Sequence, residues 1–365
     1  MKKLMVAVAA LVFMAGPAMA ADWNFYGSAR VSTFYTDFEK NPFKGGVDSE
    51  DYEQNLNGNA RIGANITVND ALTGRFEYGT LGGVNTRILW GEWNFGAGSL
   101  GVGKNYTPLL FPYSNQVYNI AGFNKGDINM SAFGMLYGSR KSMVRLTFGD
   151  FEIAAVEPKS VYTNQAFLQN AFGWSTETKM PSIQAKYGID GNKWHLRFAG
   201  GYQTFDIKAN NRDYEVDSWI LGIGGRVDVG AAYFKGNVWG GQNVGNMADI
   251  LVNNSLASAP ATLDGDGWGY AVFNGTEVID KDALAALVVA GYKIREGLYL
   301  EAGYGYVETE LDTPGAVTDD ADTYYIQSTI FLAPGVFLTP EIGVIDLNQD
   351  NSKVTYYGIK WQINF

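Results

Sequence analysis

Charged side chains stand at alternate positions within segments that are otherwise rich in apolar, β-branched and aromatic residues. Glu301, for example, lies between Leu300 and Ala302. A repeat of two is typical of a β-strand whose two faces meet different surroundings. Fixed charges on one face of a strand attract, repel or orient ions and dipoles without covalent chemistry. The strand positions of this kind are Arg30, Arg61, Arg75, Arg87, Lys141, Arg145, Glu301, Glu341 and Lys360, and Asp127 lies in a long connection.

Patterns for catalysis, metal binding and cofactor binding are weak. His195 is the single histidine, and no nearby residue suggests the nucleophilic serine and acid that a lipase would require. The sequence has no cysteine, which excludes thiol chemistry, disulfides and thiolate metal sites. The segment 264–267 resembles a fragment of a calcium-binding loop but lacks the third oxygen ligand and the closing glutamate. We therefore expect no catalytic residue, metal, cofactor or nucleic-acid partner.

Two segments near the N-terminus indicate what the faces of the strands contact. In residues 22–38, Trp23 and Phe25 belong to an apolar set that alternates with a polar set containing Arg30. In residues 54–68, the apolar set alternates with a row of asparagines, namely Asn55, Asn57, Asn59 and Asn65. Buried amides need hydrogen-bond partners, so such a row is costly in a dry core and costs little where it faces water. We predict that the polar faces line a water-filled lumen and that the apolar faces contact lipid.

The connections between the predicted strands alternate in length. Short turns rich in turn-forming residues are predicted at 69–70, 96–98, 149–150, 190–191, 228–230, 295–297 and 333–335. Long connections are predicted at 37–53, 107–137, 158–180, 206–216, 240–283, 308–322 and 346–352, with one short exception at 82–85. This alternation predicts an all-β, antiparallel up-and-down barrel of about 16 strands that spans a membrane. Residues 266–279 are assigned to a long connection, since a further strand would make the count odd.

The N-terminal residues predict export. Residues 1–20 combine two lysines, an apolar run and a small-residue cleavage site after Ala20, a pattern typical of a secretory signal peptide. No later stretch approaches the roughly 18–20 apolar residues of a membrane helix. We expect residues 21–365 to form a single barrel domain.

The C-terminal segment, KVTYYGIKWQINF, alternates between large apolar and polar or small residues. An ordinary half-buried edge strand is one interpretation. The segment also resembles the terminal strand of bacterial outer-membrane barrels, which implies that it is the signal read by the barrel-assembly machinery. The residues that carry this resemblance are Tyr357, Ile359, Trp361, Ile363 and Phe365.

Residues 87–108, RILWGEWNFGAGSLGVGKNYTP, resemble a stretch of Gram-negative general porins, which are trimeric. The matching features are Arg87, Gly91, Phe95-Gly96, Leu100, Gly103 and Pro108, and in style the chain is similar to the porins of sulfate-reducing bacteria. The resemblance implies a diffusion channel for ions and small polar solutes in the outer membrane. It also implies a homotrimer in contact with lipid and lipopolysaccharide, and an inward-folded constriction loop at 107–137.

Parity within the strands assigns the charges to the lumen, because a charge facing lipid at mid-membrane costs about 2–4 kcal/mol. Arg30, Arg61 and Arg75 then form one basic wall with Lys360 of the last strand, while Glu301 and Glu341 lie on another part of the wall. Arg87 is kept inside on the resemblance alone. If Arg87 points inward, strict alternation along the strand would point Glu92 outward.

Several interpretations stay open at this stage. The lumen charges either form an organised constriction or are scattered without a shared role. A substrate-specific channel with a saturable site and an outer-membrane lipase are the alternatives to a general channel. The acids of the long connections either attract cations and bridge to lipopolysaccharide or form a solvated surface. The short connection at 82–85 lacks the length for the subunit latch of general porins, which predicts a trimer that heat dissociates easily.

Overall fold

The computed structural model describes residues 21–41, 44–120, 127, 129–163, 165–250, 269–348 and 352–365. The predicted signal peptide at 1–20, the segment 264–267 and the loop residues 121–126 lie outside this range. None of the helices in the described part is long and apolar enough to span a membrane.

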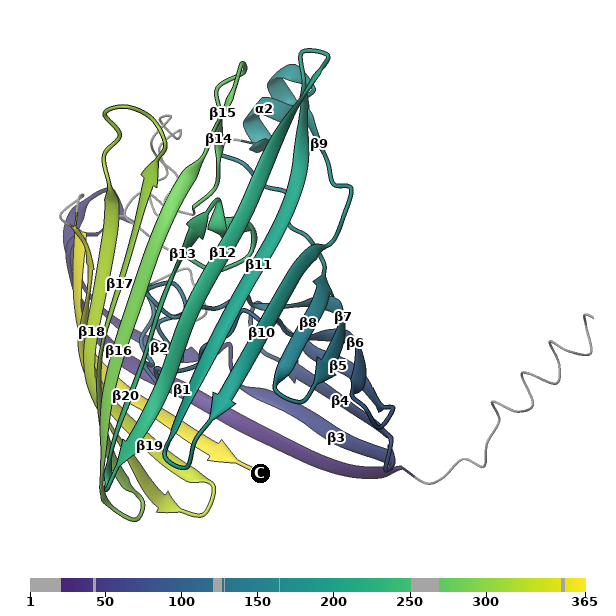
Figure 1. Cartoon of the computed structure of the whole chain (residues 1–365). Coiled ribbons are helices and arrows are strands. Elements are labelled where there is room, and N and C mark those ends of the chain that lie inside the picture. The colour runs from purple at the N-terminus through teal and green to yellow at the C-terminus, as the bar shows by residue number, and fades with distance from the viewer. Residues whose placement is uncertain are drawn as a thin grey trace, which may run out of the picture.

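Eighteen of the twenty strands in the described residues form one antiparallel sheet that closes on itself. Both β2 and β3 pair with the same side of β1, and both β9 and β10 pair with the same side of β11, so the wall has 16 strands. The predicted barrel is therefore confirmed. The strands are β1 (Asp22–Asn41), β2 (Val47–Leu56), β3 (Arg61–Asn69), β4 (Leu72–Gly79), β5 (Asn85–Asn94), β6 (Ser99–Tyr106), β7 (Arg140–Phe148), β8 (Phe151–Val156), β9 (Ser175–Glu177), β10 (Ser182–Asp190), β11 (Trp194–Ala209), β12 (Arg212–Val229), β13 (Ala232–Gln242), β16 (Lys281–Arg295), β17 (Leu298–Leu311), β18 (Asp319–Ala333), β19 (Val336–Leu347) and β20 (Ser352–Asn364) (Figure 1).

The first and last strands close the barrel. β1 pairs with β20 from Ser28↔Asn364 to Glu39↔Lys353. At the end of this seam the backbone of Phe365 exchanges two hydrogen bonds with Gly27, at 2.6 and 3.0 Å. The Phe365 ring packs over Gly27, in space that a side chain at this position would share, because a Cβ atom there would lie 2.4 Å from the ring. Closure leaves no free sheet edge, which a lipid environment requires.

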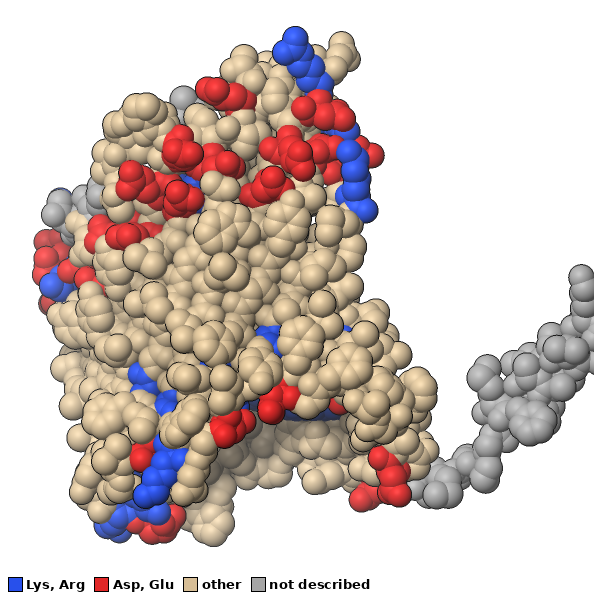
Figure 2. Space-filling model, in the orientation of Figure 1, with Lys and Arg blue, Asp and Glu red and all other residues tan. Residues whose placement is uncertain are grey.

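The outer surface is an apolar band between charged rims. Leu221 and Val288 keep 64% and 61% of their surface exposed, as lipid-facing residues do. On the face in Figure 2, acidic side chains gather at the upper rim, and the broad band below carries few charged atoms. The outward-facing residues of β20 include Tyr357, Trp361 and Ile363, and Phe365 directly after the strand is also exposed, while Ile359 is half-buried. The predicted division of faces therefore holds along the closing strand.

All seven predicted short turns are present, but three predicted long connections are shorter than expected. β11 and β12 are joined by Asn210 and Asn211 alone, both with positive φ (53° and 59°), instead of by a loop at 206–216. The connections predicted at 37–53 and 308–322 shrink to the residues between Asn41 and Val47 and between Leu311 and Asp319. These acid-rich stretches continue the paired strands, so they extend the barrel wall beyond the apolar band.

The two longest outer connections carry their own structure. Residues 157–181 include helix α2 (Gln165–Phe172) and β9. Residues 243–280 include η2 (Val244–Asn246) and a separate two-stranded sheet, β14 (Val272–Phe273) and β15 (Val278–Ile279). The described part of 266–279 is therefore outside the barrel wall, as predicted. Trp174 and Tyr214 pack on Phe273, which joins these connections to the tips of β11 and β12.

Candidate functional site

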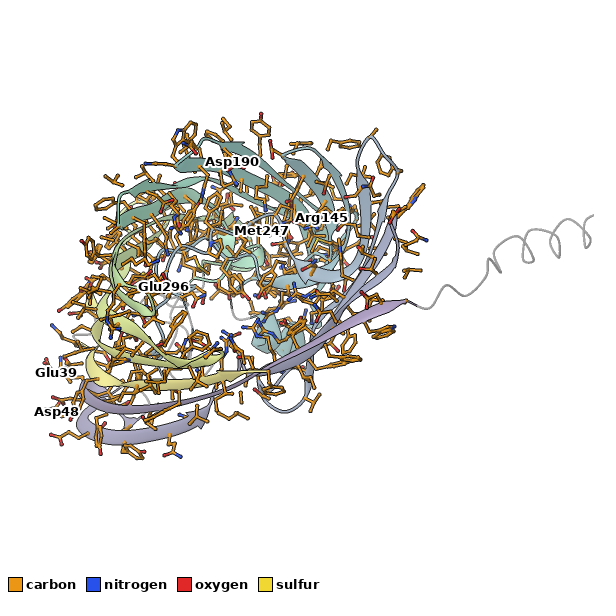
Figure 3. The ribbon with its side chains drawn as sticks, turned by 90° about the horizontal axis from the view of Figure 1, so that it is seen from below. Glu39, Asp48, Arg145, Asp190, Met247 and Glu296 are labelled. Atoms are coloured by element: carbon orange, nitrogen blue, oxygen red, sulfur yellow. The ribbon has the colours of Figure 1, made fainter. Side chains whose placement is uncertain are left out.

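The connection between β6 and β7 enters the barrel, and its described residues (107–120, 127 and 129–139) form the inner loop. This inner loop has a largely apolar underside, with Leu109, Phe111 and Val117 fully buried. It rests directly on the wall where the wall has glycine. A Cβ atom on Gly224 of β12 would lie 2.6 Å from the Tyr113 ring, and one on Gly305 of β17 would lie 2.0 Å from the carbonyl oxygen of Phe133. The glycines make room for the loop, and the predicted inward fold is present (Figure 3).

Two wall carboxylates fix the middle of the inner loop. Glu301 accepts hydrogen bonds from the backbone N–H and the side-chain amide of Asn115, at 3.0 and 2.8 Å. Glu341 accepts the backbone N–H groups of Val117 and Tyr118, both at 2.8 Å. Each glutamate is only 4% exposed. The sequence assigns both acids to the lining of the lumen, but they lie beneath the loop as its anchors and do not face the open channel.

The far end of the inner loop is held by the seam between β1 and β20. Asp127 pairs with Arg30 at 2.7 Å and with Lys360 at 2.6 Å, and its backbone carbonyl accepts a hydrogen bond from Asn59 at 3.0 Å. The Tyr118 ring stacks on Tyr356 of β20, with centroids 4.1 Å apart. The loop therefore reaches from β6 to the wall of β17 and β19 and to the adjoining closing seam.

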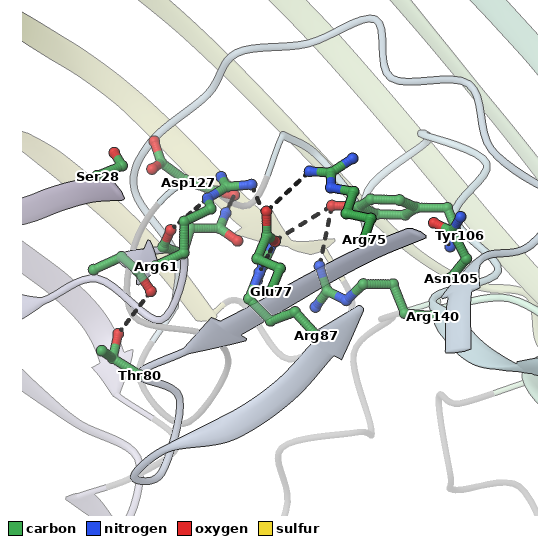
Figure 4. Close-up of polar contacts among 12 residues, drawn as sticks. Ser28, Arg61, Arg75, Glu77, Thr80, Arg87, Asn105, Tyr106, Asp127 and Arg140 are labelled. Atoms are coloured by element: carbon green, nitrogen blue, oxygen red, sulfur yellow. Dashed lines mark hydrogen bonds and ion pairs between the residues drawn. The ribbon is translucent and has the colours of Figure 1, made fainter. Parts of the chain in front are cut away.

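A cluster of arginines surrounds Glu77 of β4, beside this seam (Figure 4). The fully buried Glu77 carboxylate pairs with Arg87 at 2.6 Å, with Arg75 at 3.0 Å and with Arg61 at 3.4 Å. Tyr26 donates a further hydrogen bond to it at 2.9 Å. Three guanidinium groups share one carboxylate, so the cluster keeps a net positive charge. Glu77 is absent from the sequence prediction, although it stands two positions after Arg75 and hence on the same face.

Arg140 extends this basic surface from the start of β7. Its guanidinium donates to the Tyr106 hydroxyl at 3.1 Å, and Arg87 donates to the same hydroxyl at 3.4 Å. A cavity of about 290 Å³ lies between these arginines and the inner loop, with Asp127 and Asn59 also in its lining. Arg140 is a second residue that the sequence analysis missed, because it stands at a strand end.

A β-bulge explains the parity conflict at Arg87. Glu77 pairs with Ile88 but the next residue, Tyr78, pairs with Thr86, so Arg87 is an extra residue in β5. The bulge lets Arg87 point inward together with Ile88, Trp90 and Glu92, while Leu89 and Trp93 face outward. Glu92 consequently faces the lumen, where it accepts hydrogen bonds from Trp90 at 3.0 Å and Ser99 at 2.9 Å. The expected outward direction of Glu92 is wrong.

The two remaining predicted cations lie apart from the Glu77 cluster. Arg145 lies 3.5 Å from both Glu92 and Glu152. Lys141 donates to the backbone carbonyl of Asn246 at 3.2 Å.

Residues 243–250 add an unexpected layer to the interior. The Asp249 N–H donates to the Tyr137 carbonyl at 2.9 Å, which ties this connection to the inner loop. Met247 is buried, and a Cβ atom on Gly201 of β11 would lie 3.1 Å from its sulfur. The sequence analysis predicts this segment only as part of a long connection, because no residue pattern within it indicates that it turns inward.

Comparison with known proteins places this architecture in a family. A family model described as Gram-negative porin matches residues 7–350. No curated protein sequence matches the chain. The outer membrane channel DcaP of Acinetobacter baumannii is 16% identical, with 94% of this chain and 97% of that chain covered and a TM-score of 0.70. OmpF of Salmonella typhi is 14% identical, with 93% and 97% covered and a TM-score of 0.59.

The trimer form of OmpT from Vibrio cholerae is 17% identical, with 95% of this chain and 100% of that chain covered and a TM-score of 0.58. At these identities the likeness establishes the fold. The family model covers most of the sequence, and the chain belongs to the Gram-negative porin family.

Proposed function

We propose that this porin is a general diffusion channel of the outer membrane, and that the inner loop defines its narrowest section. Ions and small polar solutes would pass down their gradients through the space between the loop and the arginines around Glu77. The path of the loop carries this proposal, because the loop leaves β6 and is held on the wall across the lumen by Glu301 of β17 and Glu341 of β19, with Asp127 at the neighbouring β1–β20 seam. Passage past fixed charges selects among solutes without tight binding.

Shortening the inner loop tests this function. An isolated bridge between Leu110 and Tyr137 continues the β6–β7 pairing, so residues 111–136 can be replaced by a two-residue turn beyond it. We expect single-channel conductance in planar bilayers to rise on the order of twofold, because the open lumen of such a barrel is far wider than a small solute. Shortening the outer connection at 312–318 is the matched control and should leave conductance unchanged. Equal conductance in the two variants would show that the inner loop does not limit flow.

The same proposal includes partners. The apolar outer band suits lipid, and the acidic rim suits lipopolysaccharide bridged by divalent cations. OmpT, which shares the fold, is described in a trimer form, and we infer a homotrimer for this chain. Only residues 80–84 separate β4 from β5, too few for a latch, so heat should dissociate this trimer readily. A trimer that survives boiling in detergent would contradict the inference.

The alternatives differ from this proposal in simple assays. A substrate-specific channel predicts flux that saturates at low solute concentration. A lipase predicts hydrolysis of lipid esters that His195→Ala abolishes. We expect no hydrolysis, since His195 stacks on Tyr113 of the inner loop with ring centroids 5.8 Å apart.

A further inference from the structure

A second cavity, of about 310 Å³, lies under the beginning of the inner loop, away from the Glu77 cluster. It is formed by the inner faces of β10 to β13 and is covered by the loop. Its lining consists of Leu110, Pro112, Tyr113, Lys186, His195, Arg197, Arg226 and Lys235. This basic cavity has four cationic side chains and no carboxylate in its lining.

The acids that pair with these cations lie outside the lining. Lys186 lies 3.2 Å from Glu152 and Arg197 lies 2.7 Å from Asp190. Arg226 lies 2.6 Å from Asp228 and Lys235 lies 3.2 Å from Glu301. Each pair is therefore a dipole whose positive end belongs to the cavity and whose negative end does not. Four such dipoles attract an anion, and the paired acids hold the cations in place.

Aromatic contacts keep two of the cations apart. The Tyr233 ring lies between them, 4.8 Å from the Arg226 guanidinium and 4.7 Å from the Lys235 ammonium. Tyr233 also donates to Glu301 at 2.7 Å. A Cβ atom on Gly291 of β16 would lie 2.0 Å from this ring, so that glycine gives the ring its position. The charges are thus preorganised around an open space instead of collapsing onto one another.

The basic cavity adjoins the first cavity. Leu110 and Pro112 line both, so the two groups of cations lie next to each other along the beginning of the inner loop. We propose that the basic cavity is a binding station for a small oxyanion with two or more negative charges, a role that rests on the proposed channel function. Such an anion engages two of the separated cations at once, whereas a monovalent anion engages one.

Channel block by sulfate tests this proposal. Single-channel chloride current is recorded at constant ionic strength, so that screening does not change, while sulfate replaces part of the chloride. We expect saturable block in the wild type. In the double variant Lys186→Gln/Arg226→Gln, the half-blocking concentration should rise at least about tenfold, the equivalent of about 1.4 kcal/mol. Neither side chain anchors the inner loop.

Two further variants serve as controls. Lys208→Gln removes a cation from the same barrel at the outer tip of β11, where Lys208 pairs with Asp213. The half-blocking concentration of sulfate should be the same in this variant as in the wild type. The charge-conserving Lys186→Arg/Arg226→Lys variant should retain the block, which separates lost charge from lost folding.

The outcomes separate this proposal from the channel function. A wild-type protein that forms no conducting pore would overturn the proposed function itself. A pore of normal conductance without saturable sulfate block would overturn only the anion site. Equal loss of block in Lys208→Gln and the double Gln variant, or full block in both, would likewise refute the assignment to the basic cavity.

Discussion

Asp127 and Lys360 are 233 positions apart in the chain, yet Lys360 Nζ lies 2.6 Å from Asp127 Oδ1. Lys360 belongs to the strand that closes the barrel, and Asp127 belongs to the inner loop. The same seam therefore closes the wall and receives the loop. Arg30, on the other strand of the seam, completes the attachment at 2.7 Å.

Removing the loop acid should change ion selectivity. Asp127→Asn leaves Arg30 and Lys360 without their carboxylate, so the narrow section becomes more positive. We expect the reversal potential under a salt gradient to move towards anion selectivity, with an effect that fades as salt shortens the screening length. Asp312→Asn makes the same charge change at the exposed outer rim and should have little effect. Identical shifts in the two variants would mean that Asp127 is remote from the ion path.

Removing the acid from the arginine cluster should destabilise the barrel. Glu77→Gln leaves Arg61, Arg75 and Arg87 close together without a compensating charge. Breaking a buried ion pair from one side costs about 3–5 kcal/mol, and part of that cost is relieved here because Arg75 is partly exposed. We expect the variant to denature in detergent at a lower temperature than the wild type. The mobility shift on electrophoresis measures this denaturation. An unchanged denaturation temperature would show that water solvates the three arginine charges well enough to replace the Glu77 carboxylate.

Filling the space of one wall glycine should displace the inner loop. A Cβ atom in Gly305→Ala would lie 2.0 Å from the carbonyl oxygen of Phe133, which belongs to rigid backbone. We expect higher and noisier single-channel conductance. Gly91→Ala is the matched control, because nothing lies within 4 Å of the added atom. Conductance that changes equally in both variants would argue against displacement of the loop.

Loss of the terminal aromatic residue should prevent assembly rather than conduction. Deletion of Phe365 removes the two backbone hydrogen bonds to Gly27 and leaves the N–H and C=O of Gly27 unpaired at the end of the closing seam. We expect little folded protein in the outer membrane, measured by heat modifiability. Phe148→Ser removes another exposed aromatic beside a short turn and should assemble. Normal yield of the Phe365 deletion would contradict an assembly signal in the last strand.

The sequence by itself determined the local pattern of this porin. Alternation of apolar and polar residues assigns faces to each strand because the repeat of a strand is two. The turn formers around 190–191 and 333–335 end the strands, so the strand number follows from the sequence. Parity also assigned Arg30, Arg61 and Arg75 to the inside, where the structure has them in contact with Asp127 and Glu77.

Only the tertiary structure decided which charges meet. Strand register places residues of β3, β4 and β5 around Glu77, and a single bulged residue reverses the parity expected for Glu92. The path of the inner loop buries Glu301 and Glu341 as anchors and carries Asp127 to the seam. These contacts join segments far apart in the chain, and a period of two carries no information about register or about the course of a loop.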